Sequence, residues 1–307
     1  MKKLDFHIHV YGDIPVSESV RYLNDMCERF GYEGVGVMAL WHNSRGYHLD
    51  CNEKALAIKN AMPGSYAFAG LDYNKNFVSQ TEDYMASGFD GIKLLAGKPS
   101  EYRHFGYGYE HPRFYEFFEY AEKHEIPVMI HNNDPVGNWD ITKVSKSIIA
   151  KGWYYDEKMP RQKFFFDVLD EVFVNFPNLR AAIAHTGFYS ENMLDKADRM
   201  LESYPNLHFD ITPALNTYYE MNKTHDQAEA FFTKNHDRLI FGTDAIDNLV
   251  GHDREYNIKK NAITDAFLQG KENDYSRKDN IVPLDLTEEM LENSYYNNAL
   301  RFIKKAL

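Results

Sequence analysis

The sequence predicts an α/β fold, and within that class a (β/α)8 TIM barrel with additional C-terminal helices, as a single domain over residues 1–307. Three observations predict it. Eight short apolar, β-rich runs recur along the chain, amphipathic segments separate them, and the connections are abrupt before each run but long after it. Strands that alternate with helices pair in parallel, and eight such units typically take about 250 residues.

The elements follow one another in regular order. The eight predicted strands cover residues 3–10, 34–41, 65–71, 90–96, 126–131, 180–185, 206–211 and 238–243. The clearest predicted helices cover residues 17–31, 112–125, 161–176 and 228–236. In the first of these, Ser17 stands where an N-cap is expected and Gly31 where the helix should end. Two further segments, near 255–268 and 287–305, predict helices added after the eighth strand.

The connections into and out of the strands differ in length. Pro177 and Pro205 each stop a helix, and a strand follows at once in the similar sequences FPNL and YPNL. The segments that leave strands are longer and cover 42–51, 97–112, 132–159, 212–226 and 245–254. In a barrel those segments all lie at the C-terminal face, where active sites are built.

Composition narrows the setting and the partners. The chain has 34 basic and 46 acidic residues, a net charge of −12, and its charges are scattered, which argues against nucleic acid and anionic membranes as partners. No apolar run reaches membrane-spanning length, and the start MKKLDFHIHV is too polar for the hydrophobic region of a signal peptide. The two cysteines show no metal-type pairing and suit a reducing compartment. We therefore expect a cytoplasmic protein.

Two histidines stand one residue apart in the first predicted strand. Side chains alternate along a strand, so His7 and His9 point to one face while Phe6, Ile8 and Val10 point to the other. In a barrel the apolar set faces the helices and the histidines face the lumen. Two imidazoles on neighbouring same-face positions can bind one cation at about 2.0–2.1 Å. Taken alone, the pair is a weak signal, because chance on an amphipathic strand produces it as well.

Other strand ends carry residues of the same chemical kind. His131 ends the fifth predicted strand, His185 ends the sixth, and Asp244 lies just beyond the eighth. With His7 and His9 they make five metal-ligand or acid–base side chains on one rim. Packing alone explains such a set poorly, and we interpret it as a metal site.

The motifs that hold these residues resemble a known superfamily. DFHIH, GFDGIKLL, IPVMIHNND, FPNLRAAIAHTG and LIFGTDA occur in the order found in the amidohydrolase superfamily, over roughly residues 1–250. The sequence is most similar to its amidohydrolase-related (amidohydrolase 2) branch of metal-dependent hydrolases, lactonases and nonoxidative decarboxylases. The resemblance implies a metal-dependent enzyme. Relatives with this barrel are often dimers or larger, so it also implies a homo-oligomer.

The resemblance also assigns roles to individual residues. It implies four ligands to a divalent metal ion: His7, His9, His131 and Asp244. His185 matches the sixth-strand histidine that acts as an acid–base or polarising group in mononuclear members. We expect one ion per chain, most commonly Zn²⁺, with Mn²⁺ as the alternative.

Lys93, in the fourth predicted strand, has two interpretations. Binuclear members carry a carbamylated lysine at this strand end that bridges two metals, and Lys93 could be that residue. Alternatively, it is a lumen-facing ammonium that binds substrate oxyanions, and this is the role we expect. Arg103, in the aromatic-rich segment 97–112, is a second predicted substrate-binding cation. The sequence is equally compatible with the alternative, in which these aromatic side chains pack the loops onto the barrel and the cations are solvated.

Two aspartates have the strand parity that would point them into the lumen. Asp5 and Asp210 are therefore candidate hydrogen-bond partners of the ligating histidines. Asp5 could equally be a carboxylate that stabilises the fold at the bottom of the barrel.

The expected reaction is hydrolysis of a small carbonyl compound: a lactone, amide or ester, and an anionic one. A divalent cation lowers the pKa of bound water to about 7. Asp244 would accept the proton of the attacking water, and His185 would polarise the carbonyl or stabilise the oxyanion. In a nonoxidative decarboxylase the same residues would protonate the substrate carbon and release carbon dioxide.

Two other functions remain open on the sequence. A phosphoesterase of the polymerase-and-histidinol-phosphatase family also opens with Asp-x-His-x-His and has a histidine after the second strand, which His42 faintly matches. That family has an acidic residue just before this histidine, where the present chain has Trp41. A non-catalytic binding barrel is the other alternative, and the intact set of five rim residues argues against it.

Overall fold

The strands form one parallel sheet. A computed structural model describes residues 1–10, 14–40, 51–189, 193–247 and 252–304 of the chain. The strands within those residues are β1 (Asp5–His9), β2 (Val35–Met38), β3 (Tyr66–Gly70), β4 (Gly91–Gly97), β5 (Val128–Asn132), β6 (Ala181–Ile183), β7 (Leu207–Asp210), β8 (Leu239–Ile240) and β9 (Ala245–Ile246). Neighbours in the order β8-β7-β6-β5-β4-β3-β2-β1-β9 are all parallel. All eight predicted strands are present, and the eighth is split into β8 and β9.

The split eighth strand closes the barrel. One of its pieces, β8, pairs with β7, and the other, β9, pairs with β1. Between them, the backbone N–H of Phe6 donates to the carbonyl of Phe241 at 3.1 Å, and that of Asp244 donates to the carbonyl of His7 at 2.8 Å. The predicted TIM barrel is therefore confirmed. The prediction of one continuous strand over 238–243 is wrong, because the chain leaves strand geometry between the two pieces.

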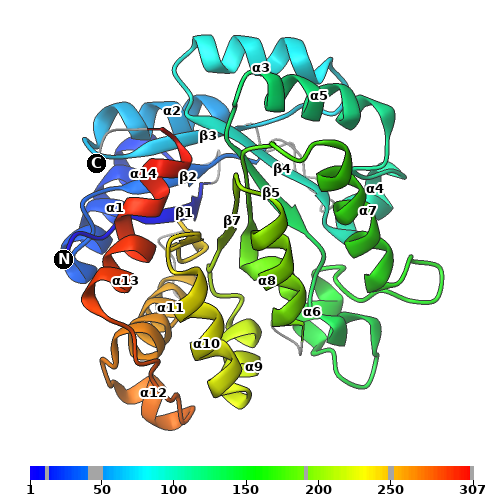
Figure 1. Cartoon of the computed structure of the whole chain (residues 1–307). Coiled ribbons are helices and arrows are strands. Elements are labelled where there is room, and N and C mark those ends of the chain that lie inside the picture. The colour runs from blue at the N-terminus through cyan, green and yellow to red at the C-terminus, as the bar shows by residue number, and fades with distance from the viewer. Residues whose placement is uncertain (11–13, 41–50, 190–192, 248–251, 305–307) are drawn as a thin grey trace.

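Helices surround the strands (Figure 1). They are α1 (Val16–Phe30), α2 (Asn52–Ala61), α3 (Phe77–Ala86), α4 (Pro99–Phe105), α5 (Pro112–Lys123), α6 (Lys146–Ala150), α7 (Gln162–Asn175), α8 (Leu194–Ser203), α9 (Leu215–Lys223), α10 (His225–Asn235), α11 (His252–Gln269), α12 (Asp274–Lys278), α13 (Glu288–Glu292) and α14 (Asn298–Phe302). Short 3₁₀ turns η1 (Val136–Trp139) and η2 (Ala184–Phe188) and a π-helical turn η3 (Asn293–Asn297) complete the elements. The predicted added helices are confirmed as α11 and as α13 to α14.

The barrel interior is packed where the strands begin. Inward side chains of several strands form one buried cluster with α14. The Phe302 ring stacks on Phe68 with their centroids 6.1 Å apart and their planes at 2°. The backbone N–H of Leu4 donates to the carbonyl of Tyr295 at 2.8 Å, which fixes the same C-terminal segment beside β1 (Figure 1). The segment with η3 and α14 thus closes the N-terminal end of the barrel, which leaves the C-terminal end to the loops.

The position of Phe6 departs from the predicted alternation. Phe6 was expected to face the helices with Ile8 and Val10, but its ring lies inside the barrel, 5.6 Å from that of Phe68. The register between β1 and β2 shifts before Ile8. A bulge of this kind breaks the strict alternation of faces. Ile8 and Val10 belong to the outer core that packs on the helices, as predicted.

The first helix begins earlier than predicted. Pro15 is its N-cap, no side chain caps it, and Ser17 already lies inside the helix. The carbonyl of Pro15 accepts the backbone N–H of Glu18 at 3.0 Å, so the helical bonding starts before Ser17 can serve as a cap. The predicted end is confirmed, since Gly31 takes the left-handed conformation at φ 72° that favours glycine.

The long segments after the strands hold structure of their own. Segment 97–112 contains α4, 132–159 contains η1 and α6, and 212–226 contains α9. Residues 41–50, with Trp41 and His42, lie outside the described residues. In the part of the chain that is described, no helix combines the length and the hydropathy that a membrane span requires.

Candidate metal centre

His7 lies in β1 with its ring fully buried. Its Nδ1–H donates to Oδ2 of Asp210, at the end of β7. The other carboxylate oxygen of Asp210 accepts the backbone N–H of Thr212 at 2.7 Å. A carboxylate that accepts from Nδ1–H fixes the tautomer and leaves Nε2 with its lone pair free for a metal. Asp210 thus contacts a predicted ligand, as its strand parity predicts.

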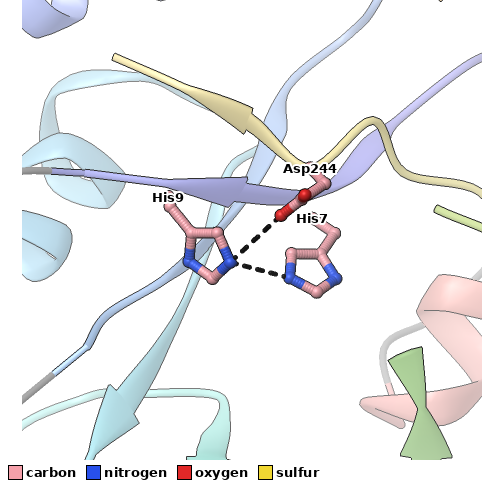
Figure 2. A group of neighbouring side chains, drawn as sticks. All are labelled: His7, His9 and Asp244. Carbon is pink, nitrogen blue, oxygen red and sulfur yellow. Dashed lines mark hydrogen bonds and ion pairs between the residues drawn. The ribbon is translucent and has the colours of Figure 1, made fainter. Parts of the chain in front are cut away.

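His9 offers its Nε2 to the same point. Its Nδ1–H donates to the carbonyl of Met38 at 2.8 Å. Its Nε2 lies 3.2 Å from Nε2 of His7 and 3.3 Å from Oδ1 of Asp244 (Figure 2). Among the described residues, His7, His9 and Asp244 form the group of three whose ligand atoms all lie within 4.8 Å of one another. Three of the four predicted ligands are therefore brought together.

Asp244 sits in the gap between β8 and β9 with a left-handed backbone, φ 53°. Its carbonyl accepts a hydrogen bond from the ammonium of Lys260 in α11. Burial raises the pKa of the Asp244 carboxyl, but Lys260 and His9 outweigh burial and hold that pKa well below its usual range. Close approach to β1 is possible because residue 242 is glycine. A Cβ on Gly242 would lie 2.6 Å from Cβ of His7.

His185 lies next to the donor group but outside strand geometry. The sixth strand was predicted to extend to residue 185, whereas β6 ends at Ile183 and the chain continues as η2. His185 has φ 58°, a left-handed conformation that lifts it off the strand. Its ring centroid is 5.9 Å from that of His7 and 5.0 Å from that of His131. Its Nδ1–H donates to the carbonyl of Thr212 at 3.3 Å.

His131 is not part of the three-residue donor group. It was predicted to end the fifth strand, but β5 runs one residue further, to Asn132, and the Nε2–H of His131 donates to the carbonyl of Asn133 at 3.1 Å. The same nitrogen lies 3.8 Å from Oδ1 of Asp134. Burial lowers the pKa of His131 and that of His185 to about 4 each. Both rings are therefore neutral at pH 7, which is the state that a metal ligand requires. The role of His131 as fourth ligand stays a prediction.

Lys93 is a buried ammonium beside the donor group. Its side chain comes from β4, is 2% exposed, and places Nζ 3.4 Å from Nε2 of His7. Burial lowers its pKa to about 8, and the carboxylates of Asp210 and Asp244 limit that shift. The lysine therefore remains mostly protonated at pH 7, yet it makes no ion pair with any described residue.

A second ionic group lies at the ends of β4 and β5. The ammonium of Lys98 lies 2.5 Å from Oδ1 of Asp134, and the hydroxyl of Tyr155 donates to Oδ2 of the same carboxylate. The Lys98 ammonium also lies 4.5 Å from the ring centroid of Trp153. Burial raises the pKa of Asp134, but Lys98 and His131 hold it below its usual range. Asp134 thus lies beside His131 and also accepts a hydrogen bond from Tyr155.

The side chain of Arg103 binds the backbone of residues 152–154. Its guanidinium donates to the carbonyls of Gly152 and Tyr154. Trp139 and Tyr155 pack with their centroids 4.7 Å apart, and Tyr155 is fully buried. These contacts favour the packing interpretation of the loop aromatics. Binding of substrate by Arg103 stays a prediction.

Asp5 contacts no ligating imidazole. Its carboxylate accepts the backbone N–H of Thr243 at 2.9 Å and the Thr243 hydroxyl at 2.6 Å. It thereby ties β1 to the eighth strand. Of its two interpretations, the geometry supports the fold-stabilising one.

Two residues of the centre were missed in the sequence. Asp134 follows His131 in the polar run NND, directly after a buried strand, and that run was the available signal. Lys260 had a fainter signal, in the polar residues that recur at helical spacing on α11. Neither contact can be derived from spacing alone, because each joins segments from different elements.

Comparisons with known proteins identify the family of the chain. The sequence matches the amidohydrolase family over residues 5–305, and the chain belongs to that family. Its members are metal-dependent enzymes. The predicted family is therefore confirmed. None of the curated proteins matches the sequence.

Solved structures share the fold. An uncharacterised TIM-barrel protein of Bordetella bronchiseptica has a TM-score of 0.60 at 13% identity, over 99% of each chain. A probable 2-pyrone-4,6-dicarboxylic acid hydrolase of Acinetobacter baumannii, with citric acid bound, has a TM-score of 0.55 at 12% identity, over 99% of this chain and 100% of that one. A dihydroxybenzoic acid decarboxylase of a Polaromonas species, with bound manganese and an inhibitor, has a TM-score of 0.55 at 11% identity, over 99% and 97%.

The donor set fits a divalent cation. Imidazole nitrogen and carboxylate oxygen are ligand types of both zinc and manganese. His7 and His9 each have Nδ1–H bonded to an acceptor, so each turns an unprotonated Nε2 toward the other and toward Asp244. Two unprotonated nitrogens 3.2 Å apart are both acceptors, so they cannot form a hydrogen bond with each other, whereas one cation could bind both.

Proposed function

We propose that the protein is a metal-dependent hydrolase that uses water to attack the carbonyl carbon of a small anionic lactone, amide or ester. The observation that carries the proposal is the convergence of the His7, His9 and Asp244 donor atoms at one end of the strands. His131 would complete the ligand set from β5. We infer one ion per chain, zinc in the first place and manganese as the alternative.

A bound divalent cation supplies Lewis acidity and lowers the pKa of coordinated water toward about 7. Asp244 stays ionised beside Lys260, so it can accept the proton of the attacking water and pass it to the leaving group. His185 keeps its hydrogen on Nδ1 because the Thr212 carbonyl accepts it. The neutral ring therefore offers Nε2 as a proton acceptor, which supports the acid–base role over the polarising role.

Lys93 would bind the anionic group of the substrate. Among the described residues this buried ammonium makes no ion pair, and a substrate carboxylate beside it would supply an opposite charge that offsets the cost of burial. The alternative is that Lys93 carries a carbamate and would bridge two metals. The distance of 3.4 Å between Nζ of Lys93 and Nε2 of His7 is compatible with either role. Elemental analysis of protein purified without chelator separates one ion from two.

A nonoxidative decarboxylase is the second candidate. Solved structures with this fold include both a dihydroxybenzoic acid decarboxylase and a probable pyrone dicarboxylic acid hydrolase. In this reaction His185 or Asp244 would deliver a proton to the substrate carbon. The family match over residues 5–305 favours these two candidates over a phosphoesterase or a non-catalytic barrel.

The proposed setting is the cytoplasm, with a small molecule as the partner and a homo-oligomer as the assembly. Both cysteines, Cys27 and Cys51, are buried, and so few cysteines in a chain of this length suit a reducing compartment. The scattered charges and net −12 support neither nucleic acid nor an anionic membrane as a ligand.

One experiment tests both candidates. The protein is stripped of metal, reconstituted with Zn²⁺ or Mn²⁺, and screened for hydrolysis of lactones, amides and esters and for carbon dioxide release from hydroxybenzoic acids. Metal-dependent hydrolysis supports the proposal, and metal-dependent carbon dioxide release supports the second candidate. A protein that binds no divalent ion contradicts both. His9→Asn serves as the control that should lose metal and activity together.

A further inference from the structure

The eighth strand is interrupted at the proposed ligand. β8 ends at Ile240, β9 begins at Ala245, and Asp244 lies in the gap. Its φ of 53° is a left-handed conformation that sterically disfavours a residue with a Cβ. Such a conformation persists only where the surrounding structure holds it. The neighbours of this residue therefore need to supply the restraint.

Two hydrogen bonds hold the Asp244 backbone. Its N–H donates to the carbonyl of His7 at 2.8 Å, which ties it to β1. Its carbonyl accepts from the ammonium of Lys260, a side chain outside the sheet that is 4% exposed. The second bond restrains the carbonyl where the interrupted strand leaves its regular geometry.

The helix that supplies this lysine turns a polar face to the barrel. Asn257, Lys260, Asn261 and Thr264 are all buried on α11, at the spacing of one helix face. Asn257 donates to the carbonyl of Ile246 at 2.9 Å, just beyond Asp244. A helix on a barrel normally presents an apolar stripe, and buried polar groups destabilise the fold unless each is bonded. Two residues of this face thus bond the backbone around the strand break.

We propose that Lys260 is a positioning residue for Asp244. Its ammonium fixes the carbonyl of the left-handed residue and so aims the carboxylate at the point it shares with His9, 3.3 Å from Nε2. The inference rests on the proposed function, in which Asp244 is a metal ligand. Lys260 touches neither the metal nor the substrate in this role.

Geometry and charge make opposite predictions for this residue. A buried positive charge near a cation site repels the cation, so on charge alone the removal of Lys260 would tighten metal binding. If its role is to place the carboxylate, removal weakens binding. The sign of the change in affinity therefore separates the two effects.

The test compares metal affinity in three variants. Lys260→Met removes the donor at similar length, Lys260→Arg restores a cationic donor, and Asn261→Leu changes the same buried face away from Asp244. Dissociation constants for Zn²⁺ and Mn²⁺ are measured against a competing chelator, and thermal midpoints are measured on the metal-free proteins. We expect Lys260→Met to weaken binding by roughly ten- to a hundredfold, as loss of a ligand-orienting contact does. Lys260→Arg should recover most of that loss, and Asn261→Leu should lower the thermal midpoint with wild-type affinity.

The outcomes are distinct. Unchanged or tighter metal binding by a folded Lys260→Met overturns the inference while wild-type binding upholds the proposed function. A wild type that binds no divalent ion overturns both. If Lys260→Met fails to fold, Lys260→Gln takes its place under the same criterion. A crystal structure of the metal-loaded wild type gives an independent reading, since a Lys260 ammonium out of reach of the Asp244 carbonyl also overturns the inference.

Discussion

The two ends of the barrel interior are built from the same strands by different means. Where the strands begin, Phe6, Phe68 and Phe302 pack ring against ring. Where they end, the rings of His7 and His9 donate hydrogen bonds to a carboxylate and a carbonyl. Dispersion is non-directional, so the apolar end needs only filled volume. Hydrogen bonds are directional, so the polar end needs a particular backbone path.

That difference is visible in the backbone. Asn133, His185, Thr186 and Asp244 all have positive φ, and all four lie just beyond strand ends at the polar end. Strained backbone of this kind is typical of functional sites. The comparison teaches that left-handed residues follow the strand ends of this barrel where polar side chains must be aimed.

The largest expected effect comes from the apolar end. Phe302→Ala should lower the free energy of unfolding by about 3–5 kcal/mol, because it empties the volume between fully buried rings. Urea denaturation measures the change, and Val282→Ala at an exposed site is the control. Metal affinity of the folded protein should not change. A loss of metal binding without a loss of stability would show that the two ends are not independent.

The polar end should respond in the reverse way. Asp210→Asn keeps the shape of the side chain but weakens its hold on Nδ1–H of His7. We expect metal affinity to fall by roughly ten- to a hundredfold, since the partner of a ligating histidine sets the basicity of the ring. Chelator competition measures it, and urea denaturation of the metal-free protein should show little change. Wild-type affinity in this variant would contradict the assignment of His7 as a ligand.

One titratable group lies at the apolar end and sharpens the comparison. Burial, aided by Arg238, lowers the pKa of His208 to about 3, and its ring lies 5.5 Å from that of Phe302. The unfolded chain, with a histidine pKa of about 6.5, then binds more protons than the folded one between pH 6.5 and 3. The stabilising effect of the neutral ring is full above pH 6.5 and is lost as the pH falls.

This linkage amounts to about 2 kcal/mol at pH 5. His208→Gln cannot titrate, so its loss of stability between pH 7 and pH 5 should be smaller than that of the wild type by about this amount. Urea denaturation at the two pH values measures both losses. Equal losses would mean that His208 does not carry the acid sensitivity.

The smallest expected effect lies outside both ends, in the helical layer. The hydroxyl of Tyr189 is buried and has no hydrogen-bond partner among the described residues. Tyr189→Phe removes that unsatisfied group, so stability should stay level or rise by up to about 1 kcal/mol. Thermal denaturation is sufficient to detect the sign. A clear loss would indicate that the hydroxyl has a bonded partner after all.

Much of the fold could be predicted from the sequence, because short apolar runs and abrupt helix-to-strand connections are local signals. His9, His131, His185 and Asp244 were also recognisable, since each stands at or near a strand end. What could not be predicted is tertiary. The bulge that turns Phe6 inward lies where β1 meets β2, and the break before Asp244 lies where β1 meets the eighth strand. The left-handed turn at His185 likewise replaces two residues of predicted strand.

The helix α14, which fills the N-terminal end of the barrel interior, is synthesised after the strands that it packs against. Phe302 packs against Phe6, nearly the whole length of the chain away, and Tyr295 bonds Leu4. A nascent chain emerges from its N-terminus, so β1 to β7 leave the ribosome before the segment that fills their interior exists. Until then the rings of Phe6 and Phe68 face an unfilled space, and such exposed apolar surface favours aggregation. The interior of the barrel is thus filled only after α14 has been synthesised.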